Sequence, residues 1–537
     1  MVKRPRAGAL AQHPAPIPIE TELKLVFDPA LASRLARHPT LRLLKRGRAR
    51  TTRLVATYFD TKDCALAAAG ITLRLRRDAG RIVQTVKGPT EADSIVGMAS
   101  RAEYEWPVPT ARLDSLRFAT TPFRRELGKA EKRGLVPLFI TDYVRTIIPL
   151  TFPDSTMATL CIDVGEVRTV DGGPPARCSI HEIEIELEAG NRQCLFDLAQ
   201  ALAVDVPLAL GQVSKAECGY RLRDPAIIAP VRASDAILAD DVTAGEAFAA
   251  IIRSCLTQID ANAAGLVHDH DPEWVHQMRI GVRRLRACLA LGRAAFPAAR
   301  LEPLRVELRW LAQTLGHVRD LDVFVDSTIP AFTTALARGS GAGPLDRALR
   351  SLIARARRRR TEARAVTRTA IASPRFIRLM LATGALAALP SGDAEPSAPA
   401  SSTLTGRARD FARPLLKRRH RQLLALGHDL AHAEPEARHA ARLAAKKLRY
   451  ATEFFAPLFP RKRTRDYRRA LATLQEELGL WNDAAVAVRL AGEIAGTEAA
   501  ATAAFSGAAA AAGAAREESL TQAWKAFADV VPFWPRR

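Results

Sequence analysis

Apolar and polar residues alternate in short runs through roughly the first 220 residues of the chain. A period of two is the pattern of a β-strand with one buried face, and turns such as Lys87-Gly88-Pro89 and Gly172-Gly173-Pro174 separate the runs. Several strands of this kind within about 200 residues predict an antiparallel sandwich or barrel. The clearest runs are residues 19–25, 71–76, 83–87, 101–106 and 182–187.

After about Pro230 the pattern changes to long helical runs of Ala, Leu and Arg, and the alternating runs end. Residues 389–406, rich in Pro, Ser, Ala and Gly, predict a flexible linker within this helical part. We therefore expect a β-domain that ends near Arg223, followed by a helical domain.

The polar face of the predicted strands is charged throughout. A face in contact with water explains any one such strand. However, Glu20 and Glu22 lie about 7 Å apart on one face, as do Glu182 and Glu184. Carboxylates that close repel each other unless a divalent cation lies between them. The alternative is a closed barrel whose charged faces point inward, with carboxylates for a metal ion and Arg and Lys for an anion.

An ordered set of charged motifs decides between these alternatives. It starts with Glu20-Thr21-Glu22-Leu23-Lys24 and ends with Ser214-Lys215. Residues 18–223 thereby resemble the CYTH superfamily of triphosphate tunnel metalloenzymes. The resemblance implies an eight-stranded antiparallel barrel that hydrolyses inorganic or thiamine triphosphate, or acts as a class IV adenylate cyclase. The motifs between these two are Arg74 and Arg76, Thr85-Val86-Lys87-Gly88, Arg145, Ile162-Asp163-Val164-Gly165 and Glu182-Ile183-Glu184.

The resemblance also implies a role for each matching residue. Catalytic roles fall on Glu20, Glu22, Lys24 and Asp163. The acidic run continues to Glu186 and Glu188, so the register of the second carboxylate pair can differ by two residues. Metal binding is implied for Glu20, Glu22, Glu182 and Glu184, and triphosphate binding for Lys24, Arg74, Arg76, Lys87, Arg145 and Lys215.

The chemistry of such a site follows from charge. Triphosphate carries about four to five negative charges at neutral pH, so several guanidinium and ammonium groups are needed to hold it. Hard carboxylate ligands suit Mg²⁺ or Mn²⁺. The predicted strands contain no Ser–His or Cys–His pair, which favours direct attack by water.

The helical half contains two copies of one charged pattern. The first copy runs from His276 to Arg286 and the second from His439 to Arg449. Leu315-Gly316 and Leu478-Gly479 repeat at the offset that separates His276 from His439. Matches at a single offset predict a duplicated helical unit, with the copies over about residues 240–388 and 405–537.

The basic stripes of these helices carry a second resemblance. Residues 235–537 resemble the CHAD domain, the conserved histidine α-helical domain, whose members bind inorganic polyphosphate. The resemblance implies polyphosphate binding by His276, Arg279, Arg283, Arg286, Arg319, His439, Arg442, Lys446 and Arg449.

The charge balance agrees with a polyanionic ligand. The chain has 79 Lys and Arg against 57 Asp and Glu, a formal net charge of +22 at pH 7. No basic stretch is interleaved with aromatic residues, so nucleic-acid binding is not favoured. The seven scattered cysteines are expected to be reduced, and neither a signal peptide nor 18 consecutive apolar residues occur. We expect a cytoplasmic protein without a membrane partner, with association with polyphosphate granules as an option.

Taken together, the motifs predict an α+β multidomain protein: an eight-stranded antiparallel tunnel barrel, then an all-α duplicated helical bundle. The leading hypothesis is metal-dependent hydrolysis of inorganic triphosphate in the tunnel, with polyphosphate bound by the helical domain. One alternative is a non-catalytic polyphosphate-binding protein of granules. The other is a thiamine triphosphatase or class IV adenylate cyclase. The oligomeric state is left open.

Overall fold

The computed structural model divides the chain into two compact units. The first comprises Met1–Gly190 and Val213–Ala226, and the second Asn191–Gln212 and Ile227–Arg537. The structure describes residues 19–78, 80–90, 95, 97–170, 176–211, 213–223, 229–294, 296–337, 344–388, 404–427, 429–430, 432–495, 502–503, 505–507 and 516–534.

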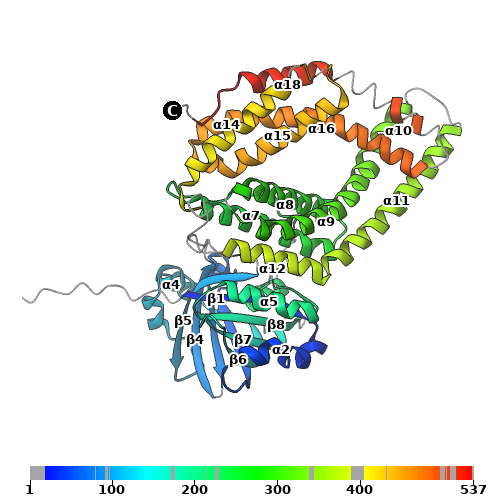
Figure 1. Ribbon diagram of the computed structural model, residues 1–537. Coiled ribbons are helices and arrows are strands. Elements are labelled where there is room, and N and C mark those ends of the chain that lie inside the picture. Colours follow the sequence, from blue (N-terminus) through cyan, green and yellow to red (C-terminus); the bar gives the residue numbers. More distant parts are fainter. Residues whose placement is uncertain are drawn as a thin grey trace, which may run out of the picture. The chain divides into compact units, whose positions relative to one another are not determined.

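The first unit is a closed antiparallel β-barrel, as predicted (Figure 1). Its strand order is β5-β4-β3-β2-β6-β7-β8-β1, and β1 also pairs with β5, which closes the barrel. The strands are β1 (Ile19–Phe27), β2 (Arg50–Asp60), β3 (Thr72–Asp78), β4 (Arg81–Thr90), β5 (Met98–Val108), β6 (Val136–Thr151), β7 (Met157–Thr169) and β8 (Arg177–Ala189). The helices are η1 (Pro29–Leu31), α1 (Ala32–Ala36), α2 (Pro39–Leu44), α3 (Ala65–Ala68), η2 (Ser115–Thr120), α4 (Arg124–Arg133) and α6 (Lys215–Arg223).

The alternating strands place their apolar side chains on the outside of the barrel. Leu23, Leu73 and Ile183 are fully buried there, while their charged neighbours point inward. On β3 and β4 this outer layer packs against Phe118, Leu127 and other residues of η2 and α4. Because the apolar layer is covered by other elements, the charged layer is left to line the interior.

Helix α6 packs on the barrel through small residues. A Cβ atom at Gly219 would lie 2.2 Å from the ring of Phe139, so only glycine permits this close approach. Ala216 joins the same apolar cluster. A disulfide joins Cys218 of α6 to Cys178 of β8, so the prediction of reduced thiols is wrong for these two cysteines.

The second unit is helical, as predicted, and includes residues 191–212, which the sequence placed in the β-domain. Within this unit α5 packs against α12, where a Cβ atom at Gly384 would lie 2.7 Å from the ring of Phe196. The elements are α5 (Gln193–Asp205), β9 (Leu208–Leu210), α7 (Ala244–His268), α8 (Pro272–Leu291), η3 (Gly292–Ala294), α9 (Ala298–Val323), η4 (Phe324–Thr328), α10 (Ile329–Ala337), α11 (Pro344–Ile371), α12 (Pro374–Ala388), α14 (Ala408–Leu426), α15 (Pro435–Phe455), η5 (Ala456–Leu458), α16 (Arg461–Ala495) and α18 (Glu517–Asp529).

The helices repeat with the same offset that separates His276 from His439 in the sequence. At this offset the start of α15 corresponds to the start of α8, and the start of α16 to the start of α9. Helices α7 and α14 meet through their N-terminal ends, where Ala244 N donates to Gly406 O and Ala408 N to Val242 O. Phe248 and Phe411, which occupy equivalent positions in the two repeats, lie with their ring centroids 5.4 Å apart. This reciprocal contact is what an approximate internal twofold axis produces.

The predicted linker and the apolar helices complete the comparison between sequence and structure. Most of the predicted linker, residues 389–403, lies outside the described residues. No single helix in the described part of the chain is long and apolar enough to cross a membrane. Two consecutive helical segments, Ala348–Ile371 and Pro374–Ala388, are long and apolar enough only when taken together, and the chain bends by 55° between them.

Candidate functional site

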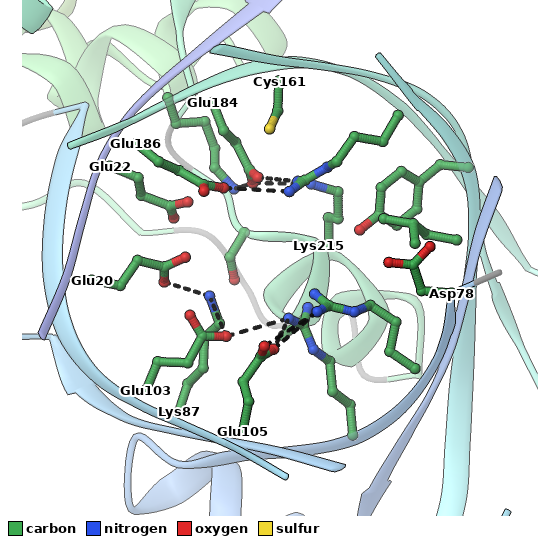
Figure 2. Close-up of a pocket in the computed structure, with 18 of the residues that line it drawn as sticks. Glu20, Glu22, Asp78, Lys87, Glu103, Glu105, Cys161, Glu184, Glu186 and Lys215 are labelled. Atoms are coloured by element: carbon green, nitrogen blue, oxygen red, sulfur yellow. Dashed lines mark hydrogen bonds and ion pairs between the residues drawn. The ribbon is translucent and has the colours of Figure 1, made fainter. Parts of the chain in front are cut away.

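The inward faces of the barrel strands enclose a cavity of about 310 Å³ (Figure 2). Almost all of its lining is polar or charged. The cavity brings together nine of the eleven predicted tunnel residues, namely Glu20, Glu22, Lys24, Arg74, Arg76, Lys87, Arg145, Glu184 and Lys215. The remaining two, Asp163 and Glu182, are buried directly behind this lining, where both contact Lys215.

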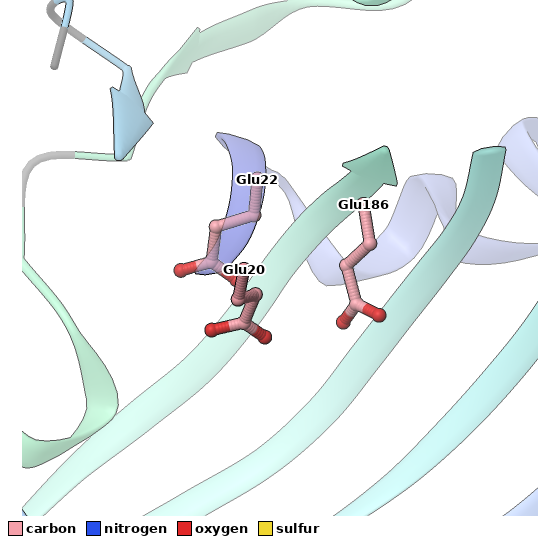
Figure 3. Close-up of side chains that lie close together, drawn as sticks. All are labelled: Glu20, Glu22 and Glu186. Atoms are coloured by element: carbon pink, nitrogen blue, oxygen red, sulfur yellow. The ribbon is translucent and has the colours of Figure 1, made fainter. Parts of the chain in front are cut away.

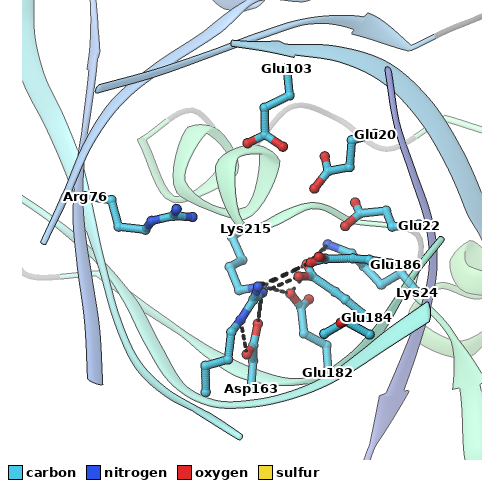
Figure 4. Close-up of polar contacts among 12 residues, drawn as sticks. Glu20, Glu22, Lys24, Arg76, Glu103, Asp163, Glu182, Glu184, Glu186 and Lys215 are labelled. Carbon is cyan, nitrogen blue, oxygen red and sulfur yellow. Dashed lines mark hydrogen bonds and ion pairs between the residues drawn. The ribbon is translucent and has the colours of Figure 1, made fainter. Parts of the chain in front are cut away.

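A first carboxylate group consists of Asp163, Glu182 and Glu184 from β7 and β8 (Figure 4). Strand register explains the cluster, because Asp163 lies opposite Glu182, and Lys24 of β1 lies opposite Glu184. Lys24 Nζ lies 3.0 Å from Glu184 Oε1, and Lys215 Nζ lies 3.0 Å from the same oxygen.

Each carboxylate of this first group therefore has a cationic partner. Arg145 contacts both Asp163, at 2.7 Å, and Glu184. Burial alone would raise the pKa of Glu184, but Lys215, Lys24 and Arg145 hold it well below its usual range. The same contacts raise the pKa of Lys24 and Lys215 despite their burial. The group is a neutralised network of ion pairs.

A second carboxylate group consists of Glu20, Glu22 and Glu186 (Figure 3). Glu22 of β1 lies opposite Glu186 of β8, so both side chains enter the barrel at one level. Burial raises the pKa of Glu186 to about 7, with neighbouring carboxylates adding to the shift and Arg145, 3.3 Å away, opposing it. One oxygen from each carboxylate lies within 4.8 Å of the others, as ligands of one ion would.

This second group fits a hard divalent cation better than the first. Its three oxygen ligands suit Mg²⁺ or Mn²⁺, and a cation would offset the burial and the neighbouring carboxylates that together raise the pKa of Glu186. In the first group, each carboxylate contacts at least two of Lys24, Arg145 and Lys215. The second group has fewer such contacts, which join Glu20 to Lys87, Glu22 to Arg101 and Glu186 to Arg145. The prediction that Glu182 and Glu184 bind a metal ion stays a prediction. The acidic run left the register of the second pair open by two residues, and Glu186, two residues after Glu184, is the one that lies beside Glu20 and Glu22.

Three of the six predicted phosphate-binding cations, Arg74, Arg76 and Lys87, line the cavity from β3 and β4. Arg76 NH2 lies 3.1 Å from Glu105 Oε1, and Arg74 NH2 lies 3.4 Å from Glu103 Oε1. Lys87 Nζ contacts Glu20 at 2.5 Å. Among the described residues, eight Lys and Arg side chains line the cavity, whereas nine carboxylates line it or pair with them. The unliganded tunnel is thus close to neutral.

The sequence missed several lining residues. Arg101 pairs with Glu22 at 3.0 Å and shares the inward face of β5 with Glu103 and Glu105. The period of two through residues 101–106 was the available signal. Tyr58 and Tyr143 also line the cavity, and the Tyr143 ring lies 4.8 Å from Lys215 Nζ. No charged motif in the sequence includes these tyrosines, so the sequence did not predict that they line the cavity.

A second basic site lies in the helical unit, in a cavity of about 250 Å³. Helices from both repeats line it, with Arg279 and Arg442, and Arg283 and Lys446, at equivalent positions of the two copies. We call these four residues, together with His276 and Arg319, the basic cluster. The other three predicted residues, Arg286, His439 and Arg449, are exposed and outside this cavity. Arg449 instead pairs with Glu453 at 2.7 Å.

The basic cluster has more cations than anionic partners, because five Lys and Arg side chains share the cavity with two carboxylates, Asp320 and Asp483. Burial, with Arg442, Arg283 and Arg279 nearby, lowers the pKa of Lys446 to about 7. Burial and neighbouring arginines also lower the pKa of Arg279, whose NH2 group lies 4.0 Å from Asp320 Oδ1. The arrangement concentrates positive charge that a bound polyanion would neutralise.

Comparison with known protein families identifies both domains of the chain. Residues 18–220 match the model of the CYTH domain, and residues 250–492 match the model of the CHAD domain. The chain is a CYTH domain followed by a CHAD domain, as the sequence motifs predicted.

Individual relatives cover one domain or part of the chain. An inorganic triphosphatase of Haemophilus influenzae is 31% identical over 210 residues, which is 38% of this chain; the chain spans about half of that relative's length, 54%. The solved CHAD domain of the plant Ricinus communis is 35% identical, covering 55% of this chain and 96% of its own, with a TM-score of 0.47. A putative adenylyl cyclase from Hippeastrum with a dominant triphosphatase activity is 19% identical, covering 39% and 97%, with a TM-score of 0.28.

Proposed function

We propose that the barrel hydrolyses inorganic triphosphate with a bound Mg²⁺ or Mn²⁺, and that the helical unit binds polyphosphate through the basic cluster. The observation that carries the first part is the charge balance of the tunnel. Eight basic side chains face nine carboxylates, so a ligand with about four to five negative charges enters only with additional positive charge. The triphosphatase relative supports the same substrate class.

The chain's own residues divide the work of binding and orientation. Arg74, Arg76 and Lys87 hold phosphate oxygens on one wall, exchanging their present carboxylate partners for the substrate. Glu20, Glu22 and Glu186 would hold the metal ion next to this wall, where Lys87 contacts Glu20. When bound, the ion neutralises phosphate oxygens and activates or orients the attacking water.

Three buried cations, Lys24 of β1, Arg145 of β6 and Lys215 of α6, hold the first carboxylate group in place by ion pairs. Lys215 and Arg145 fix the first carboxylate group and remain positive toward the substrate. The Cys161 thiol also lines the cavity, but burial raises its pKa far above neutrality, so it is a poor nucleophile. Direct attack by water therefore remains the favoured route.

The test is phosphate release by the full chain from tripolyphosphate, ATP, thiamine triphosphate and long-chain polyphosphate, with Mg²⁺, Mn²⁺ or EDTA. Tripolyphosphate should be the best substrate. Glu22→Gln, which is nearly isosteric, should lower the rate by at least about a hundredfold. Glu131→Gln on the exposed face of α4 is the control and should leave the rate unchanged. Full activity of Glu22→Gln would refute the tunnel site.

For the basic cluster, the supporting observation is its shortage of anionic partners. Polyphosphate binding to the full chain should need no metal ion and should weaken steeply with added salt, by analogy with counterion release from nucleic acid. Binding that is insensitive to salt would contradict this part of the proposal. A protein that binds polyphosphate but releases no phosphate from any substrate would favour the non-catalytic alternative. We expect this protein to be located in the cytoplasm.

A further inference from the structure

A second cavity in the helical unit, of about 1680 Å³, is a groove that involves no residue of the basic cluster. Residues 410–424 of α14 line it, and its other sides are formed by the N-terminal end of α16 and by the end of α18 with the residues that follow it, up to Trp534. We call it the α14 groove. None of the motifs that identified the two domains maps to it.

One wall of the α14 groove is cationic. Arg413, Lys417 and Arg421 stand every fourth residue on α14, so successive charges are about 6 Å apart along the helix. Like charges at this spacing destabilise a helix by a few tenths of a kcal/mol per pair, so helix stability does not explain why these three cations are present. Lys462 and Arg463 of α16 add two further cations to the groove.

The opposite wall is apolar. Val530, Val531, Pro532 and Trp534 line it, and Val531 is 80% exposed. Its base is firm, because His420 shares a hydrogen bond of 2.9 Å with Tyr467 and packs near Trp534. A ligand that fits must offer negative groups to one wall and apolar groups to the other.

The first repeat shows what the equivalent helix face contacts. At the offset between the two copies, Lys417 and Arg421 correspond to Ser254 and Gln258 of α7, which carry no charge. Ser254 donates to the backbone oxygen of Ser234, which lies in a segment without helix or strand structure, at 3.1 Å. Asn262, two turns further on α7, exchanges hydrogen bonds with the backbone of Val231 in that segment at 2.9 and 3.1 Å. In the first repeat, α7 therefore holds a segment of the same chain through Ser254 and Asn262, while Gln258 is buried and contacts Gln277 of α8.

We propose that the α14 groove binds an extended acidic segment of a partner protein, with Asp or Glu alternating with apolar residues. In an extended chain every second side chain points the same way, about 6.6–6.8 Å apart, which matches the spacing of about 6 Å between the cations. Alternation presents carboxylates to α14 and apolar side chains to the wall at residues 530–534. Asp410, Asp466 and Asp529 also line the groove, which disfavours an inorganic polyanion that is charged at every unit.

The experiment measures binding of a labelled eight-residue peptide of alternating Glu and Val to the full chain, by fluorescence anisotropy. A peptide with four Glu followed by four Val is the composition control. We expect the alternating peptide to bind at least about tenfold more tightly. The double variant Lys417→Glu, Arg421→Glu should weaken it at least about tenfold, since two ion pairs become repulsive. Val531→Asp should weaken it as well.

A matched control reverses two exposed charges elsewhere. Arg358→Glu with Arg359→Glu on α11 should leave peptide binding unchanged. Equal binding of the two peptides, or undiminished binding by the Lys417, Arg421 variant, would overturn the proposal. So would displacement of the peptide by tripolyphosphate at equal charge, which would make the groove a general anion surface. None of these outcomes depends on the triphosphatase activity of the barrel.

Discussion

The barrel tunnel and the basic cluster of the helical unit hold positive charge in opposite ways. In the tunnel each predicted phosphate-binding cation has a carboxylate partner, and the pKa values of Lys24 and Lys215 are raised in spite of burial. In the basic cluster the cations face one another, and the pKa of Lys446 falls to about 7. The tunnel pairs are Lys24–Glu184, Arg74–Glu103, Arg76–Glu105, Lys87–Glu20, Arg145–Asp163 and Lys215–Asp163.

This difference teaches what each site requires from its ligand. A tunnel whose charges already cancel must receive extra positive charge together with a polyanion, which accounts for carboxylates in a phosphate site. The basic cluster needs only the polyanion, because neutralising its repulsion is itself favourable. Both sites are rich in Lys and Arg, yet only one should depend on metal.

Metal removal should separate the two sites most sharply. With EDTA, phosphate release from tripolyphosphate should fall at least about a hundredfold, because the tunnel loses the charge that balances its substrate. Polyphosphate binding by the same full-length protein, measured in parallel, should change little. Equal loss of both functions would mean that the comparison is wrong.

Within the tunnel, neighbouring arginines on one strand should behave differently. Arg76→Ala should lower kcat/KM for tripolyphosphate about ten- to a hundredfold, since Arg76 lines the cavity and faces the substrate. Arg77, the next residue of β3, is exposed on the other face, and Arg77→Ala should be close to wild type. Similar effects of the two substitutions would place the charged strand face in bulk solvent.

In the basic cluster, equivalent arginines from the two repeats should act together. The double variant Arg279→Ala, Arg442→Ala should weaken polyphosphate binding about tenfold and lower the salt slope by about two, by analogy with phosphate contacts in nucleic acid. Arg286→Ala with Arg449→Ala removes a matched pair from the same helices, outside the cavity. That control should leave binding intact; a comparable loss would enlarge the site beyond the cavity.

The smallest expected effect is a pH dependence of the basic cluster. Free Lys446 has a pKa of about 7, so it loses its proton as the pH rises above 7, while a bound polyanion favours the protonated form. Affinity for polyphosphate should therefore fall about fivefold between pH 7 and 8, as one proton must be taken up on binding. Lys446→Arg keeps the charge throughout and should flatten this profile. An unchanged profile in that variant would assign the proton elsewhere.

The local order of the sequence predicted much of both sites. Alternation of Leu23 with Glu22 and Lys24 marked a strand with one charged face, and the constant offset between matching motifs marked the repeat that the helix starts follow. Periodicity works here because it is a property of a few consecutive residues. It placed Arg286 and Arg449 on the basic stripe, but both lie outside the cavity that the neighbouring helices form.

Strand pairing decided what the sequence left open. Whether the charged faces met water or each other depended on β1 pairing with β5, which closes the barrel and brings Glu22 to Arg101 from far along the chain. The grouping of Glu186 with Glu20 and Glu22 follows from the β1–β8 register. So does the neutralisation of Glu184 by Lys24, while Lys215 and Arg145 reach the same carboxylate from α6 and β6.

By itself, the sequence determined which side chains share a face and in what order the charges occur, since these follow from the spacing of residues along a strand or helix. Only the tertiary structure decided which charges become partners. Ion pairing depends on distances of a few ångströms between strands and helices far apart in the chain, and burial then sets how strongly each pair interacts. For that reason similar Lys and Arg residues became a paired network in the tunnel and a mutually repelling cluster in the helical unit.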